Sequence, residues 1–331
     1  MKLALIYRQP TPEAFSIERL FSTIARHLRG VEVVEYVMSG RARLLSDVRS
    51  IRKLDADIYH VTGDVNYVVP LLPRGKTVLT VHDIGHYLHR LYGLKRVLYK
   101  WIWFTLPLRC ASAVTCVSPE TAHNLQAHFR LTDGKVHIID NCLTAAVLPS
   151  TREFYSQSPR ILQVGTKPYK NVPRLIQALA GIPCTLVLVG VIDAAIREAL
   201  DKSQVKYENH VGVTDAVLVD LYGHCDMVAF ASTGEGFGLP IIEAQAAARP
   251  LVTSDVLPLS EVAGVGACLV NPLDVASIRD GLRRIIDDDN YRHSVVQAGL
   301  ANASRYSPWL VASSYRDIYD TICFSGGRSA A

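Results

Sequence analysis

The sequence predicts an α/β protein with parallel sheets and crossover helices, organised as two domains. Short runs of apolar, β-branched residues alternate with longer segments of helical spacing to the end of the chain. The 331 residues suit two domains at ~100–200 residues each. The composition, 49% hydrophobic and 20% charged, is that of a folded globular protein. There is no close repeat of fixed short period, so a solenoid is not expected.

Twelve strands are expected, each a short apolar run. In the first half they cover residues 3–7, 31–37, 58–61, 77–81, 113–117 and 136–139. In the second half they cover residues 160–164, 185–189, 205–210, 227–231, 251–253 and 268–270. Helices are expected between the strands. Two of them have clear start signals, because Ser118 and Thr214 each offer an N-cap oxygen and are each followed by an acidic residue in the first turn.

A polar stretch at residues 149–159 lacks apolar periodicity and separates the two runs of six strands. We therefore expect it to contain the linker between a domain of residues 1–150 and a domain of residues 156–306. The charge is uneven, at +7 for residues 1–155 and −3 for the remainder. The basic half is therefore expected to bind an anionic partner.

Targeting signals and metal motifs are not expected. The longest apolar stretches fall far below the ~18 residues of a membrane span, and residues 1–7 are too short an apolar run for a signal peptide. The seven cysteines form no C-x-x-C pair and no spacing typical of zinc ligands. A cytoplasmic location fits such cysteines best.

The strongest chemical signal is the segment STGEGFGLPIIEA at residues 232–244, between a strand and a helix. Strand, glycine loop and helix is the order of a phosphate-binding site. Gly236 and Gly238 let the backbone approach a ligand, and Pro240 suits the first helical position. Glu235 in the loop and Glu243 in the first helical turn suit hydrogen bonds from sugar hydroxyls. Taken alone, they could equally be a solvated loop acid and a helix-cap carboxylate.

In this context the chain resembles the retaining glycosyltransferases of family four, whose signature is an E-x7-E pattern within E-G-F-G-L-P-x-x-E-A. Further similar segments lie at residues 161–166, 170–175, 211–215, 221–222, 260–262 and 270–274. The resemblance implies the GT-B fold, with two Rossmann-like domains whose parallel sheets face each other across a cleft. It also implies a C-terminal helix at residues 307–323 that returns to the first domain.

The implied activity is transfer of a hexose or N-acetylhexosamine from a nucleotide diphosphate sugar to a sugar hydroxyl, with retention and without a metal or other cofactor. The resemblance places Glu235 on the donor sugar and Glu243 on the ribose. It places the backbone amides of Phe237, Gly238 and Leu239 on sugar hydroxyls and phosphate. Assembly of a cell-surface polysaccharide or glycolipid is the expected setting.

Further site residues are expected in other loops. Lys167 and Lys170 follow a strand, where ammonium groups could neutralise a departing diphosphate; the alternative is two solvated loop lysines. Gly165 in the same loop and Val213, in the segment similar to the base pocket, are expected donor-binding residues. The segment that contains His82 resembles the family's His-Asp segment, so His82 is an expected catalytic residue. The alternative is a local structural role, since a lone histidine after a strand is more often a hydrogen-bonding residue.

Three further features bear on metals and on the acceptor. His82, His86 and His89 lack a carboxylate or cysteine that would complete a metal site, so no metal is expected.

The first loop, residues 8–13, has two prolines where the family often has glycines, which places the donor contact of this domain in doubt. The acidic run 287–289 ends a helix and predicts a solvated face.

The segment 91–109 has an apolar stripe at helical spacing with basic residues around it. The stripe comprises Leu94, Val97, Leu98, Trp101, Ile102 and Leu108. It predicts either a helix on a membrane surface, with the enzyme peripheral on the inner face, or a core helix with snorkelling basic side chains. The charge of this half favours an anionic surface or a lipid-linked saccharide acceptor, while nucleic acid is not expected because no recognised binding motif is present.

Two other functions stay open. One is a nucleotide-sugar epimerase or hydrolase of the same fold. The other is a non-catalytic GT-B protein that binds a partner transferase.

Overall fold

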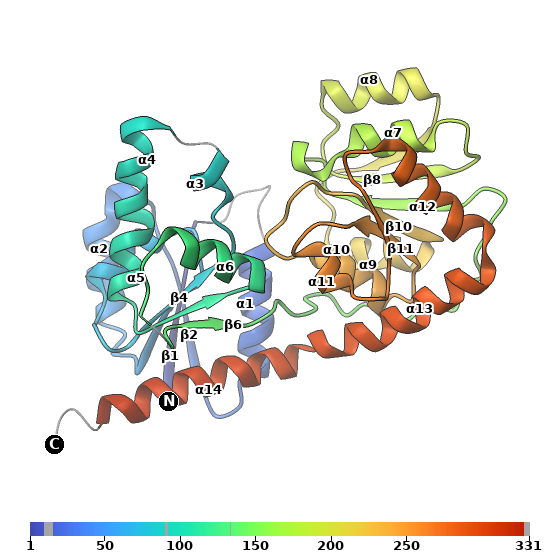
Figure 1. Ribbon diagram of the computed structural model, residues 1–331. Coiled ribbons are helices and arrows are strands. Elements are labelled where there is room, and N and C mark those ends of the chain that lie inside the picture. Colours follow the sequence, from blue (N-terminus) through green and yellow to red (C-terminus); the bar gives the residue numbers. More distant parts are fainter. Residues whose placement is uncertain (10–15, 90–91, 133, 328–331) are drawn as a thin grey trace. The chain divides into compact units, whose positions relative to one another are not determined.

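The chain forms two compact units, which we describe separately. A computed structural model describes residues 1–9, 16–89, 92–132 and 134–327 (Figure 1). Unit 1 comprises Met1–Thr144 and Pro308–Ala331, and unit 2 comprises Ala145–Ser307.

The expected linker belongs to unit 2. Its Ser150 amide donates to the Ala247 carbonyl at 3.0 Å, and its Tyr155 amide donates to Asp226 Oδ1 at 3.1 Å. These hydrogen bonds fasten the polar stretch to unit 2, so the division falls after Thr144 and not in the stretch itself.

Each unit is built on one sheet of six parallel strands, which confirms the expected fold class. In unit 1 the order is β2-β1-β3-β4-β5-β6, with β1 Lys2–Tyr7, β2 Glu32–Val37, β3 Ile58–Val61, β4 Thr77–Val81, β5 Ala113–Cys116 and β6 Val136–Ile138. In unit 2 the order is β12-β11-β10-β7-β8-β9, with β7 Arg160–Val164, β8 Thr185–Val189, β9 Lys206–His210, β10 Met227–Phe230, β11 Leu251–Ser254 and β12 Cys268–Val270. All twelve expected strands are present, and no strand end differs from its expected position by more than one residue.

The helices lie between the strands as expected. Those of unit 1 are α1 Ser16–His27, α2 Leu44–Arg52, α3 Gly85–His89, α4 Gly93–Tyr99, α5 Leu106–Cys110, α6 Pro119–His128 and α14 Pro308–Gly327. Those of unit 2 are α7 Val172–Leu179, α8 Ala194–Ser203, α9 Asp215–His224, α10 Leu239–Ala246, α11 Leu259–Ala263, α12 Val275–Asp287 and α13 Asp289–Ala303.

Helix starts follow the capping signals. The Ser118 side chain accepts a hydrogen bond from the Thr121 amide, and the Thr214 side chain accepts one from the Val217 amide. Four 3-10 turns and one π-helix complete the described elements: η1 Arg41–Arg43, η2 Asn66–Leu71, the π-helix η3 Lys100–Thr105, η4 Pro168–Lys170 and η5 Ser304–Tyr306.

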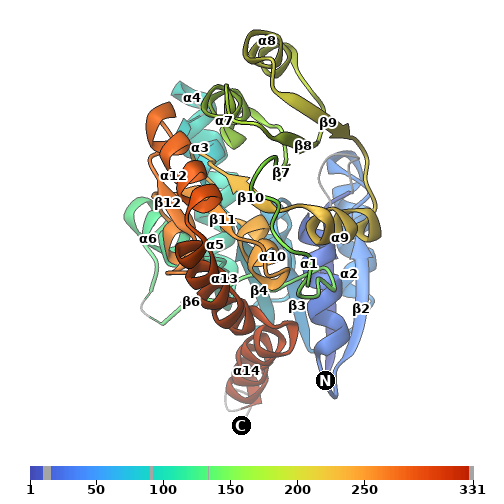
Figure 2. The same ribbon diagram turned by 90° about the vertical axis from the view of Figure 1, so that its right-hand side faces the viewer.

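Apolar side chains of the unit 1 sheet pack on both of its faces. Ala4 and Ile6 of β1 belong to a core formed with α2, η2, α5 and α6. Leu3 and Leu5 belong to the opposite core, formed with α1 and α14. Helix α14 therefore completes unit 1, where it packs against α1 (Figures 1 and 2). The C-terminal segment lies on unit 1 because its buried face fills that core.

A buried polar network connects α14 to the middle of this sheet. His60 of β3 is fully buried, with Nδ1 at 2.7 Å from the Tyr319 hydroxyl and Nε2 at 2.7 Å from Thr80 Oγ1. Thr80 Oγ1 lies 2.6 Å from Thr115 Oγ1, so the network crosses three neighbouring strands. Burial, followed by the influence of neighbouring His82, lowers the pKa of His60 to about 3. The ring is therefore neutral in the folded protein.

Unit 1 should lose stability as the pH falls below 6.5. Unfolded His60 takes up a proton near pH 6.5, whereas folded His60 does not until about pH 3. The free energy of unfolding should therefore fall by roughly 1.4 kcal/mol per pH unit, or about 2 kcal/mol by pH 5. Urea unfolding followed by tryptophan fluorescence measures this, since all three tryptophans lie in unit 1. His60→Gln should flatten the slope, and His224→Gln, at an exposed site, should not. An unchanged slope in His60→Gln would contradict the assignment.

Candidate functional site

The strongest candidate site lies at the carboxyl edge of the unit 2 sheet. From β7 the chain continues to β8 and β9 on one side, and from β10 it continues to β11 and β12 on the other. Adjacent strands β7 and β10 therefore flank a topological switch point, where open α/β sheets bind ligands. The segments singled out in the sequence, residues 165–171 and 231–238, are the loops that follow these two strands.

The two loops meet through an ion pair. Lys170 Nζ lies 2.6 Å from Glu235 Oε1, and both side chains are only 12% exposed. The ammonium group also lies 4.4 Å from the ring centroid of Phe230. Gly165 has φ +88°, and a Cβ on it would stand 2.9 Å from Lys170 Cε. Glycine is needed here because the aliphatic part of Lys170 crosses directly over the backbone.

Hydrogen bonds hold the loops in place. The Thr233 amide donates to the Tyr169 carbonyl at 2.8 Å. Asn171 is buried with φ +60°, and its Nδ2 donates to the carbonyls of Ala231 at 2.9 Å and Pro272 at 2.7 Å. One amide side chain thus connects the loops that follow β7, β10 and β12. The loop that carries Lys170 is thus held by contacts within unit 2.

Helix α10 begins directly at this edge. Gly238 has φ +101°, and a Cβ on it would stand 2.7 Å from Leu259 Cδ2. Phe237 is buried, with its ring centroid 5.7 Å from that of Tyr306. The helix starts at Leu239, so Pro240 takes its second position and not the first. The amides at this N-terminus lie beside the Glu235 loop and favour an anion.

Glu243 occupies a different position from the one expected. It is the fifth residue of α10, beyond the first turn, and it is only 4% exposed. The Tyr222 hydroxyl donates to Glu243 Oε2 at 2.8 Å. Tyr222 is fully buried, so it supports this carboxylate from inside the unit. Spacing alone could not reveal the pair, because Tyr222 comes from α9.

The remaining expected residues of unit 2 are less closely associated with the Lys170–Glu235 pair. Lys167 is exposed in the loop after β7, whereas Lys170 is largely buried. Val213 is partly buried and follows β9, the edge strand two places from β7. The structure thus brings Gly165, Lys170 and Glu235 together and leaves Lys167 at the surface.

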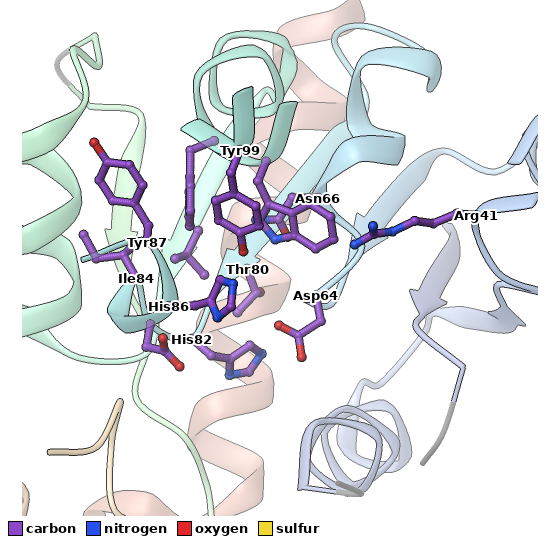
Figure 3. A pocket seen from close by; sticks show the side chains of 13 residues that line it. Arg41, Asp64, Asn66, Thr80, His82, Ile84, His86, Tyr87 and Tyr99 are labelled. Atoms are coloured by element: carbon purple, nitrogen blue, oxygen red, sulfur yellow. The ribbon is translucent and has the colours of Figure 1, made fainter. Parts of the chain in front are cut away.

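His82 follows β4 in unit 1 and is held rigidly. Its Nε2 lies 2.7 Å from the Thr62 carbonyl, and since a carbonyl only accepts hydrogen bonds, Nε2 carries the proton. Burial, the largest influence, lowers the pKa of His82 and keeps the ring neutral. Gly63 has φ +131°, and a Cβ on it would stand 2.7 Å from His82 Cδ2. His82 also lines a cavity, shown in Figure 3, which the sequence did not indicate.

Other expectations are partly tested. In the first loop, Arg8 pairs with Glu18 and Asp64, while residues 10–15 lie outside the described part of the chain. No group of three His, Cys, Asp or Glu side chains is placed to hold a metal within the described residues. In the acidic run 287–289, Asp288 caps α13.

The segment 92–109 exposes its apolar stripe. Five members are 46–84% exposed: Leu94, Val97, Leu98, Trp101 and Ile102. Leu108 is 1% exposed and belongs to the core, which corrects its expected place in the stripe. Leu106, 45% exposed, continues the stripe in its place. Residues 90 and 91 are outside the described part. No helix within the described ranges has the length and apolar character needed to cross a membrane.

The chain matches two family descriptions. Residues 158–288 match "Glycosyl transferases group 1", and residues 12–146 match "Glycosyltransferase Family 4". It is 31% identical over 160 residues to O-antigen chain mannosyltransferase B of Escherichia coli, covering 44% of this chain and 42% of that protein. The matched part thus spans less than half of that relative.

Solved structures show the same fold over nearly the whole chain. Sucrose-phosphate synthase from Thermosynechococcus elongatus has a TM-score of 0.79 at 17% identity, covering 98% of this chain and 99% of that one. HepE of Anabaena, solved with UDP and glucose, has a TM-score of 0.77 at 16% identity, covering 96% and 99%. The expected GT-B fold is confirmed.

Proposed function

Because residues 12–146 and 158–288 match two glycosyltransferase family descriptions, we propose that the chain transfers a hexose or N-acetylhexosamine from a nucleotide diphosphate sugar to a sugar hydroxyl. The observation that supports this most directly is the Lys170–Glu235 pair at the switch point of unit 2, beside the N-terminus of α10. A cation and a helix N-terminus suit a diphosphate, and a carboxylate suits sugar hydroxyls. The similarity to O-antigen mannosyltransferases favours polysaccharide assembly as the setting.

The proposed donor site uses residues of unit 2. Lys170 turns from Glu235 to the diphosphate and neutralises charge as the leaving group departs. Glu235, released from that pair, accepts hydrogen bonds from the donor sugar, while Phe237, Gly238 and Leu239 direct backbone amides to it. Glu243, held by Tyr222, accepts from the ribose. Gly165 and Val213 line this site in the proposal, and Lys167 adds positive charge at its edge.

The proposed chemistry proceeds with retention and needs no metal ion. The leaving phosphate helps to deprotonate the acceptor hydroxyl, so the enzyme supplies no nucleophile. In unit 1, His82 is the proposed catalytic residue on the acceptor side. With Nε2 donating to Thr62, Nδ1 is the hydrogen-bond acceptor of its neutral ring.

Incubation with UDP-, GDP- and ADP-sugars, with and without lipid-extract acceptors, tests the function. We expect a new glycoside with one donor class, and unchanged activity in EDTA because Lys170 and the α10 N-terminus neutralise the diphosphate.

Glu243→Gln, nearly the same shape but uncharged, should weaken donor binding. A sugar epimer or free sugar alone would favour the epimerase or hydrolase alternative, and binding without turnover the non-catalytic one. Activity lost in EDTA and restored by Mg²⁺ would contradict metal independence.

We also propose that the exposed stripe of segment 92–109 lies on an anionic membrane surface. Its five exposed apolar members and Leu106 are 45–84% exposed among the described residues, and exposed Lys95 and Arg109 stand on the same segment. Apolar and basic side chains together favour the interface of an anionic bilayer. All seven cysteines are unpaired, which fits a reducing compartment. The proposed location is therefore the inner face of the membrane.

Flotation with lipid vesicles tests this surface. The protein should float with vesicles that contain anionic phospholipid and stay behind with purely zwitterionic ones. Leu98→Glu with Ile102→Glu should abolish flotation, because both side chains are about half exposed and their charges would enter the apolar layer. Leu310→Glu, at an exposed position of α14 outside this segment, is the control. Flotation of the Leu98/Ile102 variant at the level of the wild type would overturn the proposal.

A further inference from the structure

Unit 1 contains a cavity that the proposed donor site does not use. It has a volume of about 310 Å³ and lies where β3 and β4 end, with His82 at one side and η3 as a wall (Figure 3). Small-molecule sites range over roughly 300–1,000 Å³. This cavity therefore suits a single sugar residue and is too small for a nucleotide sugar.

One buried polar atom in the cavity wall has no partner. Asn66 is 4% exposed, and its Oδ1 accepts no hydrogen bond within the described part of the chain. Buried acceptors in native proteins nearly always have a donor. Asn66 lines the cavity, so a ligand hydroxyl bound there is in a position to donate to it.

Aromatic side chains form another wall. Tyr99 and Trp103 are stacked, with ring centroids 5.1 Å apart and planes at 13°. His86 lies 5.3 Å from Tyr99, and the Arg41 guanidinium lies 5.1 Å from the Trp103 ring. Trp103 belongs to the π-helix η3, an element that often marks functional sites. Aromatic walls with hydrogen-bonding groups beside them suit sugar rings, which have both C–H surfaces and hydroxyls.

The charges of the cavity offer no surplus of cations for a phosphate. Asp64, which pairs with Arg8, and Asp83 line it as carboxylates, and Arg41 is the one cation among the described lining residues. Burial, together with these two carboxylates, raises the pKa of Tyr99, so its hydroxyl keeps its proton. Hydrogen-bond acceptors outnumber cations here. The cavity therefore favours a ligand that donates hydrogen bonds and has no negative charge.

We propose that this cavity binds one uncharged sugar residue of the acceptor, with a hydroxyl donating to Asn66 Oδ1 and the ring lying against Tyr99 and Trp103. The inference rests on the proposed glycosyl transfer and names the chemistry of its acceptor. The acceptor's terminal unit is then a neutral sugar, and any phosphate it has lies outside the cavity.

Saturation-transfer NMR on the full chain, without donor, tests the cavity directly. The probes are methyl glycosides of neutral hexoses and the corresponding hexose 1-phosphates. Neutral glycosides should bind, and the phosphates should bind no more tightly. Asn66→Leu, similar in shape but without an acceptor, and Trp103→Ala should each weaken binding about tenfold. Trp309→Ala, an exposed tryptophan on α14, is the control. Tighter binding of phosphates, or equal binding by Asn66→Leu, would overturn the proposal.

Transfer kinetics separate this inference from the proposed function. With an active donor, Asn66→Leu should raise the acceptor KM about tenfold while donor binding stays unchanged. Urea unfolding shows whether Trp103→Ala still folds, and Asn66→Leu keeps the test valid if it does not. Transfer with an unchanged acceptor KM would refute the inference and leave the proposed function standing. Glycoside binding without transfer for any donor would refute the function alone.

Discussion

Replacing Lys170 with alanine should reduce kcat/KM by about 30- to 900-fold, equivalent to roughly 2–4 kcal/mol of transition-state stabilisation. The ammonium group is only 12% exposed and pairs with Glu235 at 2.6 Å. Little water reaches this site. Solvent therefore cannot replace the lysine in stabilising the negative charge of the leaving diphosphate. Steady-state kinetics with the active donor measures the loss. Lys170→Arg should restore only part of it, because the guanidinium needs more room over Gly165.

The matched control is another lysine of unit 2. Lys202 pairs with Glu198 at the same 2.6 Å, but the two side chains are 75% and 66% exposed. Lys202→Ala should leave activity and stability nearly unchanged, since exposed ion pairs contribute about 0–1 kcal/mol. A double-mutant cycle with Glu235→Gln measures the coupling between Lys170 and Glu235. A loss below tenfold for Lys170→Ala would make Lys170 an ordinary loop lysine.

Removing residues 308–327 should prevent unit 1 from folding stably. Tyr315 is 1% and Tyr319 0% exposed, and both lie in the core formed with α1. Without α14 this core would face water, and His60 would lose its partner Tyr319. Tyr315→Ala is the milder change and should cost about 3–5 kcal/mol of unfolding free energy. Urea titrations followed by tryptophan fluorescence report on unit 1, and circular dichroism reports on both units.

The control on the same helix is Trp309→Ala. Trp309 is 53% exposed, so its loss should change the free energy of unfolding by less than about 0.5 kcal/mol. The truncated chain should still show the unit 2 transition by circular dichroism, since α14 belongs to unit 1. A truncated protein with full stability in both transitions would show that α14 is an accessory to the fold.

The strands and the phosphate-site loop could be predicted from the sequence because their signals are local. A buried parallel strand needs a continuous apolar run, which marks the inner strands of each sheet, whereas the edge strand β9 is mostly polar. All twelve strands lie within one residue of their expected ends. The loop at residues 232–238 can be recognised from the sequence because three glycines stand close together between a strand and a helix that has proline near its start. Gly238 has a φ of +101°, a backbone conformation that favours glycine.

Other features could not be predicted because they depend on contacts between distant residues. The polar stretch at residues 149–159 resembled a linker, and only its hydrogen bonds to unit 2 show that it is anchored. The sequence could not show whether the 92–109 stripe is exposed or buried, because helical spacing is the same for a core face and a surface face. Tyr99 and Trp103 of the same segment line the cavity, a position that depends on contacts with distant residues and that the sequence does not indicate.

The sequence by itself determined the α/β class, the positions of the strands and the place of Lys170 and Glu235 in the segments that follow β7 and β10. Each of these follows from backbone preferences and apolar periodicity within a few residues. Only the tertiary structure decided that Lys170 pairs with Glu235, that Tyr222 holds Glu243 and that Asn66 faces a cavity without a partner. The physical reason is strand order: a parallel sheet brings the carboxyl ends of its strands to one edge, and side chains distant in sequence become neighbours there.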